Sequence, residues 1–432
     1  MKKTYFLLTL LVLLSACRGS GQMSAYDQPD QWESATRKTA FNMGVIHMDK
    51  APGSDVLWLK NSDFSNGTIE LDIKGKNNPG ASFVGLAFNG KSDKIYDAVY
   101  FRPFNFENPE KKTHMVQYIA MPHLDWKRLR DNYPGKYEAE IQTAPKPEDW
   151  FHVKLEIEFP YVKVYVNGAE KPALTVEQIN ISGHGKIGLW VGEGSEGWYK
   201  NLRFRETKSM RSVNVLMDVG HKQVFWNDPK SMQIENEKIA RVYSMTEALF
   251  QTMKEIDGRV DYAYGPIDEQ TLKDQKILFD HIPKAQYSEK EVKAIQHFLN
   301  SGGRLFLVMD SDYWSNLEET NVNDILAPYG IRFKGAIPDS LPGGHTVASP
   351  ITMTPLKISY HEARIVEGGT PFCYGDQLGE KYPFGVYKEL DGGGKLVIMS
   401  EAMTSLYMTS WQGVDDYQCQ DFMQAVFGWL SK

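Results

Sequence analysis

The sequence contains little cysteine, with three residues in a chain of 432. Cys17 follows an apolar run at the N-terminus, so the rest of the chain holds only Cys373 and Cys419. Two cysteines are too few for a disulfide framework, and no Cys-x-x-Cys or zinc-type spacing occurs. In an oxidising compartment these two could still form a single disulfide bond.

The sequence also lacks an excess of positive charge. Its formal net charge is −7, from 48 lysines and arginines against 55 acidic residues, and no basic run follows the N-terminus. Nucleic-acid binding requires a basic patch or stripe, so the composition does not support a nucleic-acid partner. The length predicts two or three domains, each able to bury its own core.

Only one hydrophobic run looks like a targeting signal. Two lysines precede the apolar stretch from Phe6 to Leu14, which is too short to span a membrane and is typical of a secretory signal. The tetrapeptide Leu-Ser-Ala-Cys at 14–17 resembles the bacterial lipoprotein lipobox. The resemblance implies that residues 1–17 are a signal peptide and that Cys17 carries the lipid. An ordinary signal peptide with an incidental cysteine is the alternative.

Polar residues 18–39 lack periodicity and are expected to form a tether above the membrane. A lipid on Cys17 would then hold the protein at the cell envelope, on the periplasmic face or on the outer surface, without spanning the membrane.

Residues 40–206 consist of short alternating runs separated by turns. Examples are GTIELDI (67–73), ASFVGLAF (81–88), FHVKLEIEF (151–159) and GKIGLWV (185–191). This spacing predicts an antiparallel β-sandwich. The phrases YFRPFNF, VQYIAMPHLDW and GKIGLWVGEGSEGWYKNLRF resemble concanavalin A-like sandwiches, including laminin-G domains and 3-keto-disaccharide hydrolases. This fold serves lectins, adhesion modules and hydrolases, so the resemblance implies the fold more strongly than an activity.

A polar and aromatic set within this domain is the candidate glycan-binding site. Arg102 lies inside an aromatic strand, where an unpaired cation is costly, and Glu138 is its expected partner. Arginines and amides can hydrogen-bond sugar hydroxyls while an aromatic ring stacks on the sugar. The alternative is a structural ion pair that holds the loop at 121–137 on the sheet. The candidate residues are Tyr100, Arg102, Asn105, Gln117, Trp126, Arg130, Tyr137 and Glu138.

Residues 212–432 alternate apolar strands with amphipathic helices. Ser288 and Glu291 predict a capping box, and two glycines at 302–303 end the helix that it opens. Apolar runs at 213–220, 304–309 and 394–399 are typical of central parallel strands. The pattern predicts an α/β domain of βαβ units with a mostly parallel sheet.

This second region resembles class I glutamine amidotransferase-like domains of the ThuA-like, flavodoxin-like kind. The matching phrases are VNVLMDVGHKQVFWND, SGGRLFLVMDSDYWSN and GGGKLVIMSEAMTSL. In the catalytic members the strand after the capped helix ends in Gly-x-Cys-x-Gly, with the cysteine as nucleophile. Here residues 308–312 read Val-Met-Asp-Ser-Asp, without the cysteine or either glycine. The sequence therefore argues against glutaminase activity.

Polar residues after the strands of this region form a second candidate pocket. Strand ends meet at one edge of an open α/β sheet, so their side chains are expected to converge there. Three interpretations remain open: helix capping, a polar ligand, or a divalent metal held by Asp218, His221 and Asp310. No other cofactor is expected. The pocket candidates are Asp218, His221, Asp310, Ser311, Asp312, His345 and Glu401.

Together these features predict an envelope lipoprotein that binds carbohydrate without catalysis, within a glycan-handling system. Two alternatives remain. The first is a glycan-acting hydrolase or lyase that uses the sandwich groove, and the second is an envelope assembly protein whose second domain binds a protein partner.

Overall fold

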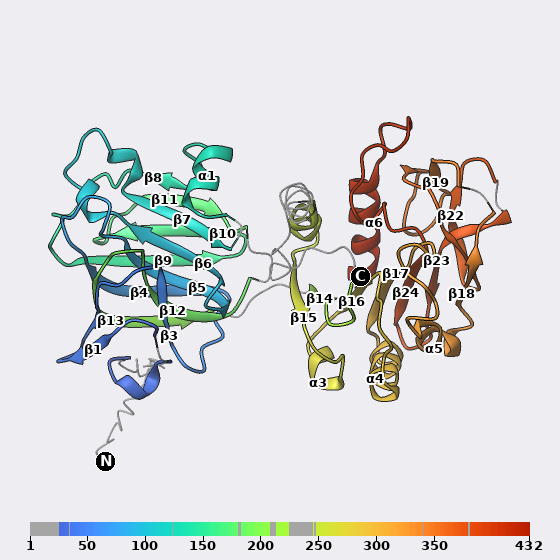
Figure 1. Ribbon diagram of the computed structural model, residues 1–432, viewed down its shortest axis with the longest axis horizontal. Helices are drawn as coiled ribbons and strands as arrows, with labels where there is room; N and C mark the ends of the chain where they lie inside the picture. Colours follow the sequence, from blue (N-terminus) through green and yellow to red (C-terminus); the bar gives the residue numbers. More distant parts are fainter. Residues whose placement is uncertain are drawn as a thin grey trace, which may run out of the picture.

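The computed structural model describes residues 26–33, 35–122, 124–179, 183–207, 213–223, 245, 248–338, 340–378 and 381–432. Figure 1 shows two domains side by side along the long axis of the molecule. The predicted signal peptide, Cys17 and the first part of the predicted tether lie outside the described residues. Within the described part of the chain, no helix combines the length and the apolar composition needed to cross a membrane.

The first domain is an antiparallel β-sandwich of two sheets, as predicted. Alternate residues of each strand point inward, so strands such as β4 (Gly67–Lys74) and β9 (Phe151–Glu158) alternate between buried and more exposed side chains. The seven-stranded sheet runs in the order β1 (Thr39–Asn42), β2 (Val45–Met48), β13 (Gly197–Glu206), β4 (Gly67–Lys74), β9 (Phe151–Glu158), β10 (Tyr161–Val166) and β11 (Leu174–Glu177). The six-stranded sheet runs β3 (Asp55–Trp58), β12 (Lys186–Val191), β5 (Val84–Ser92), β6 (Ile95–Phe101), β7 (Val116–Met121) and β8 (Glu138–Ala139).

Short helical turns lie at the edges of the six-stranded sheet. They are η1 (Pro29–Gln31), η2 (Pro103–Asn105), η3 (Lys112–His114) and helix α1 (Trp126–Asn132). Asp125 caps α1 by accepting a hydrogen bond from the Arg128 backbone N–H at 2.8 Å. η2, η3 and α1 contribute residues to the wall of the cavity described below.

The described part of the predicted tether is packed on the sandwich. Trp32 is buried in the hydrophobic core. The buried Arg37 donates hydrogen bonds to the backbone oxygens of Asp49, Gly53 and Ser195. Any free tether therefore ends before residue 26, because the apolar and hydrogen-bonding groups that follow belong to the domain.

The second domain is built on a nine-stranded mixed sheet. Its order is β15 (Gly258–Ala263), β14 (Val213–Asp218), β16 (Ile277–His281), β17 (Arg304–Val308), β24 (Lys395–Met399), β23 (Pro383–Glu389), β22 (Thr370–Gly375), β19 (Gly344–Thr346) and β20 (Lys357–Ile358). The strands from β15 to β24 pair in parallel, and those from β24 to β20 pair antiparallel. A second, two-stranded sheet joins β18 (Arg332–Ala336) to β21 (Arg364–Glu367).

The expectation of a mostly parallel, flavodoxin-like sheet is therefore corrected. The parallel half follows the predicted βαβ pattern, but the antiparallel half makes the sheet mixed, and a flavodoxin-like arrangement is not evident in the described residues. The sequence could not show this, because a short apolar strand buried on both faces has the same pattern in either direction.

Helices cover both faces of the parallel half, which buries alternate residues of each strand on opposite sides. Phe306 and Val308 of β17 pack with α6 (Cys419–Ser431) and with the helical residues 248–255, whereas Leu305 and Leu307 pack with α4 (Glu289–Asn300) and α5 (Val322–Leu326). Within the described residues this domain also contains α3 (Glu269–Leu272) and η5 (Ala327–Tyr329). Ser288 and Glu291 form the predicted capping box at the start of α4.

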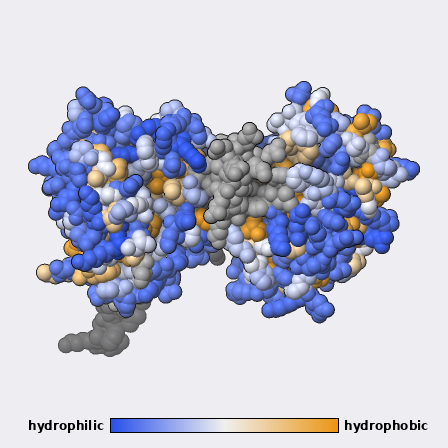
Figure 2. All heavy atoms as spheres, viewed as in Figure 1, coloured by the Kyte–Doolittle hydropathy of each residue, from blue (hydrophilic) through white to orange (hydrophobic). Residues whose placement is uncertain are grey.

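Side-chain contacts join the two domains directly. His184 Nε2 lies 2.5 Å from Asp261 Oδ1, and the Lys254 amine donates a 2.7 Å hydrogen bond to Glu177. In Figure 2 the visible surface is mostly hydrophilic, with hydrophobic residues in small, separated patches.

Candidate functional site

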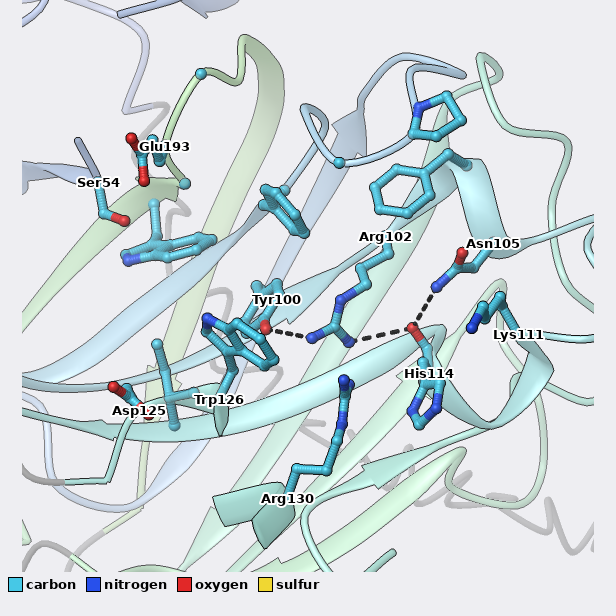
Figure 3. A pocket seen from close by; sticks show the side chains of 18 of the residues that line it. Ser54, Tyr100, Arg102, Asn105, Lys111, His114, Asp125, Trp126, Arg130 and Glu193 are labelled. Carbon is cyan, nitrogen blue, oxygen red and sulfur yellow. Dashed lines mark hydrogen bonds between the residues drawn. The ribbon is translucent and has the colours of Figure 1, made fainter. Parts of the chain in front are cut away.

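A cavity of about 880 Å³ opens on the six-stranded sheet of the sandwich. Its walls come from β6, η2, the turn before η3, α1 and the end of β12. Figure 3 shows aromatic rings and charged groups facing the same space. The aromatic wall residues are Phe83, Tyr96, Tyr100, Phe104, Trp126 and Trp190, and the charged ones are Arg102, Lys111, His114, Asp125, Arg130 and Glu193.

Arg102 is the central polar group of the cavity, and only 5 % of its surface is exposed. Its Nη1 donates to the His114 backbone oxygen at 3.1 Å, and its Nη2 donates to the Tyr100 hydroxyl at 2.6 Å and to Gln117 Oε1. Tyr100 in turn donates to Gln117 Oε1 at 2.9 Å. Burial lowers the pKa of Arg102 and raises that of Tyr100 to about 12, so the phenol stays protonated.

Strand register explains why this network forms. Tyr100 on β6 lies directly opposite Gln117 on β7, and Arg102 follows Tyr100 by two residues and therefore lies on the same face. The Gln117 amide also donates to the Trp126 backbone oxygen at 3.1 Å. The network thus holds the first residue of α1, and with it the indole, beside the cavity.

Glu138 is a buried carboxylate behind the cavity wall. Arg130 donates to it through Nε at 2.9 Å and through Nη2 at 2.6 Å, and His114 Nδ1 lies 2.7 Å from its Oε2. Arg102 is more distant, with Nη1 4.0 Å from the same oxygen. Burial alone would raise the pKa of Glu138, but the hydrogen bonds from Arg130 and His114 outweigh it, and the pKa is lowered. Glu138 is therefore an anion that positions cations.

The aromatic groups place one broad apolar face at the opening. Trp126 is 47 % exposed, and the Arg130 guanidinium lies 5.2 Å from the centre of its ring. Trp190 and Tyr96 are buried and joined by a 3.1 Å hydrogen bond between the indole N–H and the phenol oxygen. A flat ligand with an apolar face can stack on Trp126 while its polar edge meets the charged groups.

The structure brings together seven of the eight candidates in the sandwich. Tyr100, Arg102, Asn105, Trp126 and Arg130 line the cavity, while Gln117 and Glu138 hold these residues from behind. Tyr137 does not line it: its ring is buried and stacks on Tyr118 at 5.8 Å.

Sequence reasoning missed several residues of the wall. His114 and Lys111 come from the polar segment before β7, which has no periodicity that would predict which side chains face the cavity. Trp190 lies within the predicted strand run at 185–191, and nothing in that run distinguishes it from a core residue. Asp125 and Glu193 are turn residues whose place depends on the tertiary fold. The only available signal was proximity in sequence to the predicted strands.

The candidates of the second domain do not form one pocket, which corrects that expectation. Asp218 and His221 are 2.7 Å apart at the end of β14, beside Tyr287. Asp310 accepts from the Ala402 backbone N–H and lies near Glu401 in a separate buried group. His345 pairs with Asp376 at 2.8 Å on β19, near the other edge of the sheet. β16 separates β14 from β17, and β23 and β22 separate β24 from β19, so these three groups lie apart. The adjacent strands β17 and β24 bring Asp310 and Glu401 together.

Ser311 and Asp312 line a smaller cavity of about 380 Å³ with Tyr313 and Glu362. Asp312 is held by the buried Arg364, whose Nη2 lies 2.5 Å from Asp312 Oδ1. Burial raises the pKa of Asp310 to about 6, and burial together with Asp310 raises that of Glu401 to about 8.

The second domain has neither a grouped set of metal ligands nor an exposed thiol among its described residues. Across the described ranges, no three histidine, cysteine, aspartate or glutamate side chains are grouped so that they could hold a metal ion. Cys373 and Cys419 are both free and buried, and burial raises the pKa of Cys419 to about 11 and that of Cys373 well above its usual value. Neither thiol is therefore an activated nucleophile.

Comparison with protein families gives a class for the first domain. The model of the 3-keto-alpha-glucoside-1,2-lyase-like domain matches residues 23–205, and the first domain is accordingly a β-sandwich similar to that family. The model of the IFT52 GIFT domain matches residues 235–338 in the second. Among curated proteins the search found no match.

Three solved structures illustrate the likeness of each part. The N-terminal domain of mmIFT52 is 16 % identical with a TM-score of 0.39, covering 50 % of this chain and 97 % of that one. The carbohydrate-binding module CBM66 from Bacillus subtilis is 16 % identical with a TM-score of 0.31, covering 41 % and 96 %. A putative glycosyl hydrolase from Parabacteroides distasonis is 16 % identical with a TM-score of 0.29, covering 42 % and 93 %. These scores are too low to carry a functional assignment.

Proposed function

We propose that the cavity of the β-sandwich binds carbohydrate. The observation that carries this proposal is the exposed Trp126 ring beside the hydrogen-bonded floor of Arg102, Tyr100 and Gln117. Sugars combine an apolar C–H face with a rim of hydroxyls, so they match a site with one stacking surface and several fixed polar groups. The family match over residues 23–205 supports a sugar ligand.

We also propose that the protein is anchored at the cell envelope by a lipid on Cys17. Its second domain is proposed to be an amidotransferase-like domain without catalysis, because residues 308–312 lack a cysteine and both other thiols are buried. A protein partner for this domain is part of the same proposal.

The first test replaces Trp126 by alanine. Loss of the stacking surface is expected to weaken sugar binding at least about tenfold, a change of roughly 1.4 kcal/mol, in calorimetric titrations of a glycan found on an array. Tyr161→Ala is the matched control, because Tyr161 is 43 % exposed but lies on the seven-stranded sheet, away from the cavity. Equal affinities for all three proteins would contradict the proposal.

A second candidate function is elimination from a 3-keto-α-glucoside. The family match favours it, together with His114, which lines the cavity with its Nδ1 2.7 Å from Glu138. A ketone at C3 acidifies the proton on C2. A base that removes this proton leaves an enolate, and the electron pair then expels the glycosidic oxygen from C1 while the protonated base returns its proton to that oxygen. His114 is the cavity group suited to be that base, since Glu138 can orient its ring.

His114→Gln tests this candidate. Release of the departing alcohol from a 3-keto-α-glucoside is expected to fall about 10²–10⁴-fold while substrate affinity is retained. The backbone oxygen of residue 114 stays in place for Arg102 and Asn105. His47→Gln is the control, because His47 also contacts a glutamate, Glu196 at 3.3 Å, but on the other sheet. Binding without turnover by the unmodified protein would leave only the first function.

A further inference from the structure

The cations of the cavity are gathered at one end of it. Arg102, Lys111, His114 and Arg130 lie around a single region in Figure 3, whereas Glu193, Ser54 and Asp125 lie toward the opposite side. The uneven charge means that the two ends of the cavity favour different chemical groups.

The cationic end is short of negative charge. Glu138 is the carboxylate that pairs with Arg102 and Arg130, and it also contacts His114. Lys111 adds a further charge at the wall without an ion pair among the described residues. One anion therefore faces at least three permanent cations. Because Arg102 is almost fully buried and shares Glu138 with Arg130 and His114, its incompletely compensated charge is unfavourable in the empty protein.

Hydrogen-bond donors also remain unused at this end. A guanidinium has five N–H donors. Arg102 uses its two Nη atoms for three bonds to His114 O, Tyr100 and Gln117, and no described residue accepts from its Nε. Arg130 uses Nε and Nη2 for Glu138, and its Nη1 has no partner within the described chain. These donors are fixed in direction by the bonds their neighbours make.

The opposite end offers acceptors. Asp125 lies on the wall with one oxygen bonded to the Arg128 N–H, and Glu193 and Ser54 are exposed at the rim. Carboxylate oxygens at this end suit the hydroxyl groups of a neutral sugar, which can donate to them.

We propose that the ligand is an acidic carbohydrate whose carboxylate sits between Arg102, Arg130 and Lys111. This inference rests on the proposed sugar-binding function and specifies its ligand class as uronic-acid-containing glycans. A planar carboxylate matches the fork of a guanidinium and makes charge-assisted hydrogen bonds with it. The pyranose ring then lies toward Trp126, and neutral hydroxyls reach Asp125 and Glu193.

The test compares methyl glucuronide with methyl glucoside, and methyl galacturonide with methyl galactoside, as both anomers. Each pair differs only at C6, so the difference in affinity measures the exchange of a neutral hydroxymethyl group for a carboxylate. The acid of at least one pair is expected to bind at least tenfold tighter than its neutral partner to the full chain. This advantage is expected to shrink as the salt concentration rises, because part of the site is open to solvent.

Two variants locate the effect. Lys111→Gln and Arg130→Gln are each expected to reduce the ratio of acid affinity to neutral-sugar affinity severalfold. Lys111 is exposed, so its replacement does not threaten folding. Lys112→Gln is the matched control, because Lys112 is the next residue but pairs with Glu140 at 3.4 Å and does not line the cavity.

Each outcome decides between the two proposals. Neutral sugars that bind as tightly as the acids would overturn the acidic-ligand inference and leave carbohydrate binding intact. Acid binding that persists unchanged in Lys111→Gln and Arg130→Gln would place the carboxylate elsewhere and overturn it as well. If neither these glycosides nor an array of neutral and acidic glycans bind, both proposals fail together.

Discussion

Replacing Glu138 by glutamine is expected to lower the free energy of unfolding of the sandwich by about 3 kcal/mol near neutral pH. The substitution preserves shape but removes the one carboxylate that Arg102, Arg130 and His114 share. Removing one partner of a buried ion pair leaves the other charge without compensation, which is more costly than losing an exposed pair. In a domain of this size, roughly 2–4 °C of melting temperature accompany each kcal/mol, so a drop of about 6–12 °C is expected in calorimetry.

The effect of Glu138→Gln should depend on pH in one direction. The pKa of Glu138 is lowered in the folded protein, so its charge stabilises the fold above the unfolded-state pKa. That contribution is lost as the pH falls through the lowered pKa, so the two melting curves should converge in acid. Glu140→Gln is the control two residues along the chain. Among the described residues Glu140 pairs with the exposed Lys112, so its replacement should change stability little. A variant as stable as the unmodified protein at pH 7 would contradict the role given to Glu138.

The sequence predicted the sandwich and much of its site for a physical reason. Side chains two residues apart lie on one face of a strand, so Tyr100 and Arg102 could be placed together without knowing the sheet. The cost of a buried cation then required an acidic partner, which predicted Glu138 near Arg102. The structure places Glu138 there but gives its strongest hydrogen bonds to Arg130. This difference depends on where α1 lies, which only the packed fold determines.

Residues on irregular segments were beyond this reasoning. Lys111 and Glu193 reach the cavity from turns, where the direction of a side chain follows from tertiary contacts rather than from any period. The prediction that Tyr137 belongs to the site was wrong for a related reason, because its ring is buried against Tyr118. A run of polar and aromatic residues thus indicates a site but does not say which members face it.

The second domain shows the limit of reasoning from strand ends. Polar residues were expected to meet because the carboxyl ends of parallel strands share one edge. That rule needs the strand order, and the order cannot be read from a run of apolar residues. In the structure β16 separates β14 from β17, so Asp218 and Asp310 belong to different buried groups. Asp280 of β16, which the sequence did not single out, instead lies close to Asp218.

Asp280 is expected to make the stability of the second domain strongly dependent on pH. The Tyr287 hydroxyl lies 2.5 Å from Asp280 Oδ2 and 3.1 Å from Asp218 Oδ2. One hydroxyl proton cannot serve both carboxylates, so a proton on Asp280 allows a chain in which Asp280 donates to Tyr287 and Tyr287 donates to Asp218. Burial, together with the charge of Asp218, raises the pKa of Asp280 to about 7.

The sign of the pH dependence follows from that pKa. Between about pH 4, where an unfolded aspartate ionises, and pH 7, the folded state keeps a proton that the unfolded state has lost. The free energy of unfolding therefore falls as the pH rises through this window, by on the order of 4 kcal/mol at 1.36 kcal/mol per unit. Asp280→Asn has no proton to lose, so the variant should match the unmodified protein near pH 4 and exceed its stability by several kcal/mol at pH 8.

Denaturant unfolding of both proteins from pH 4 to pH 8 measures this difference, with Asp391→Asn as the control at an exposed aspartate in the turn before β24. The control should follow the unmodified protein across the range. Parallel stability profiles for Asp280→Asn and the unmodified protein would mean that Asp280 is ionised in the fold, with the Tyr287 hydroxyl donating to its carboxylate. A stability profile of the unmodified protein that falls below that of Asp280→Asn above pH 5 would show that the buried Asp280 keeps its proton in the fold.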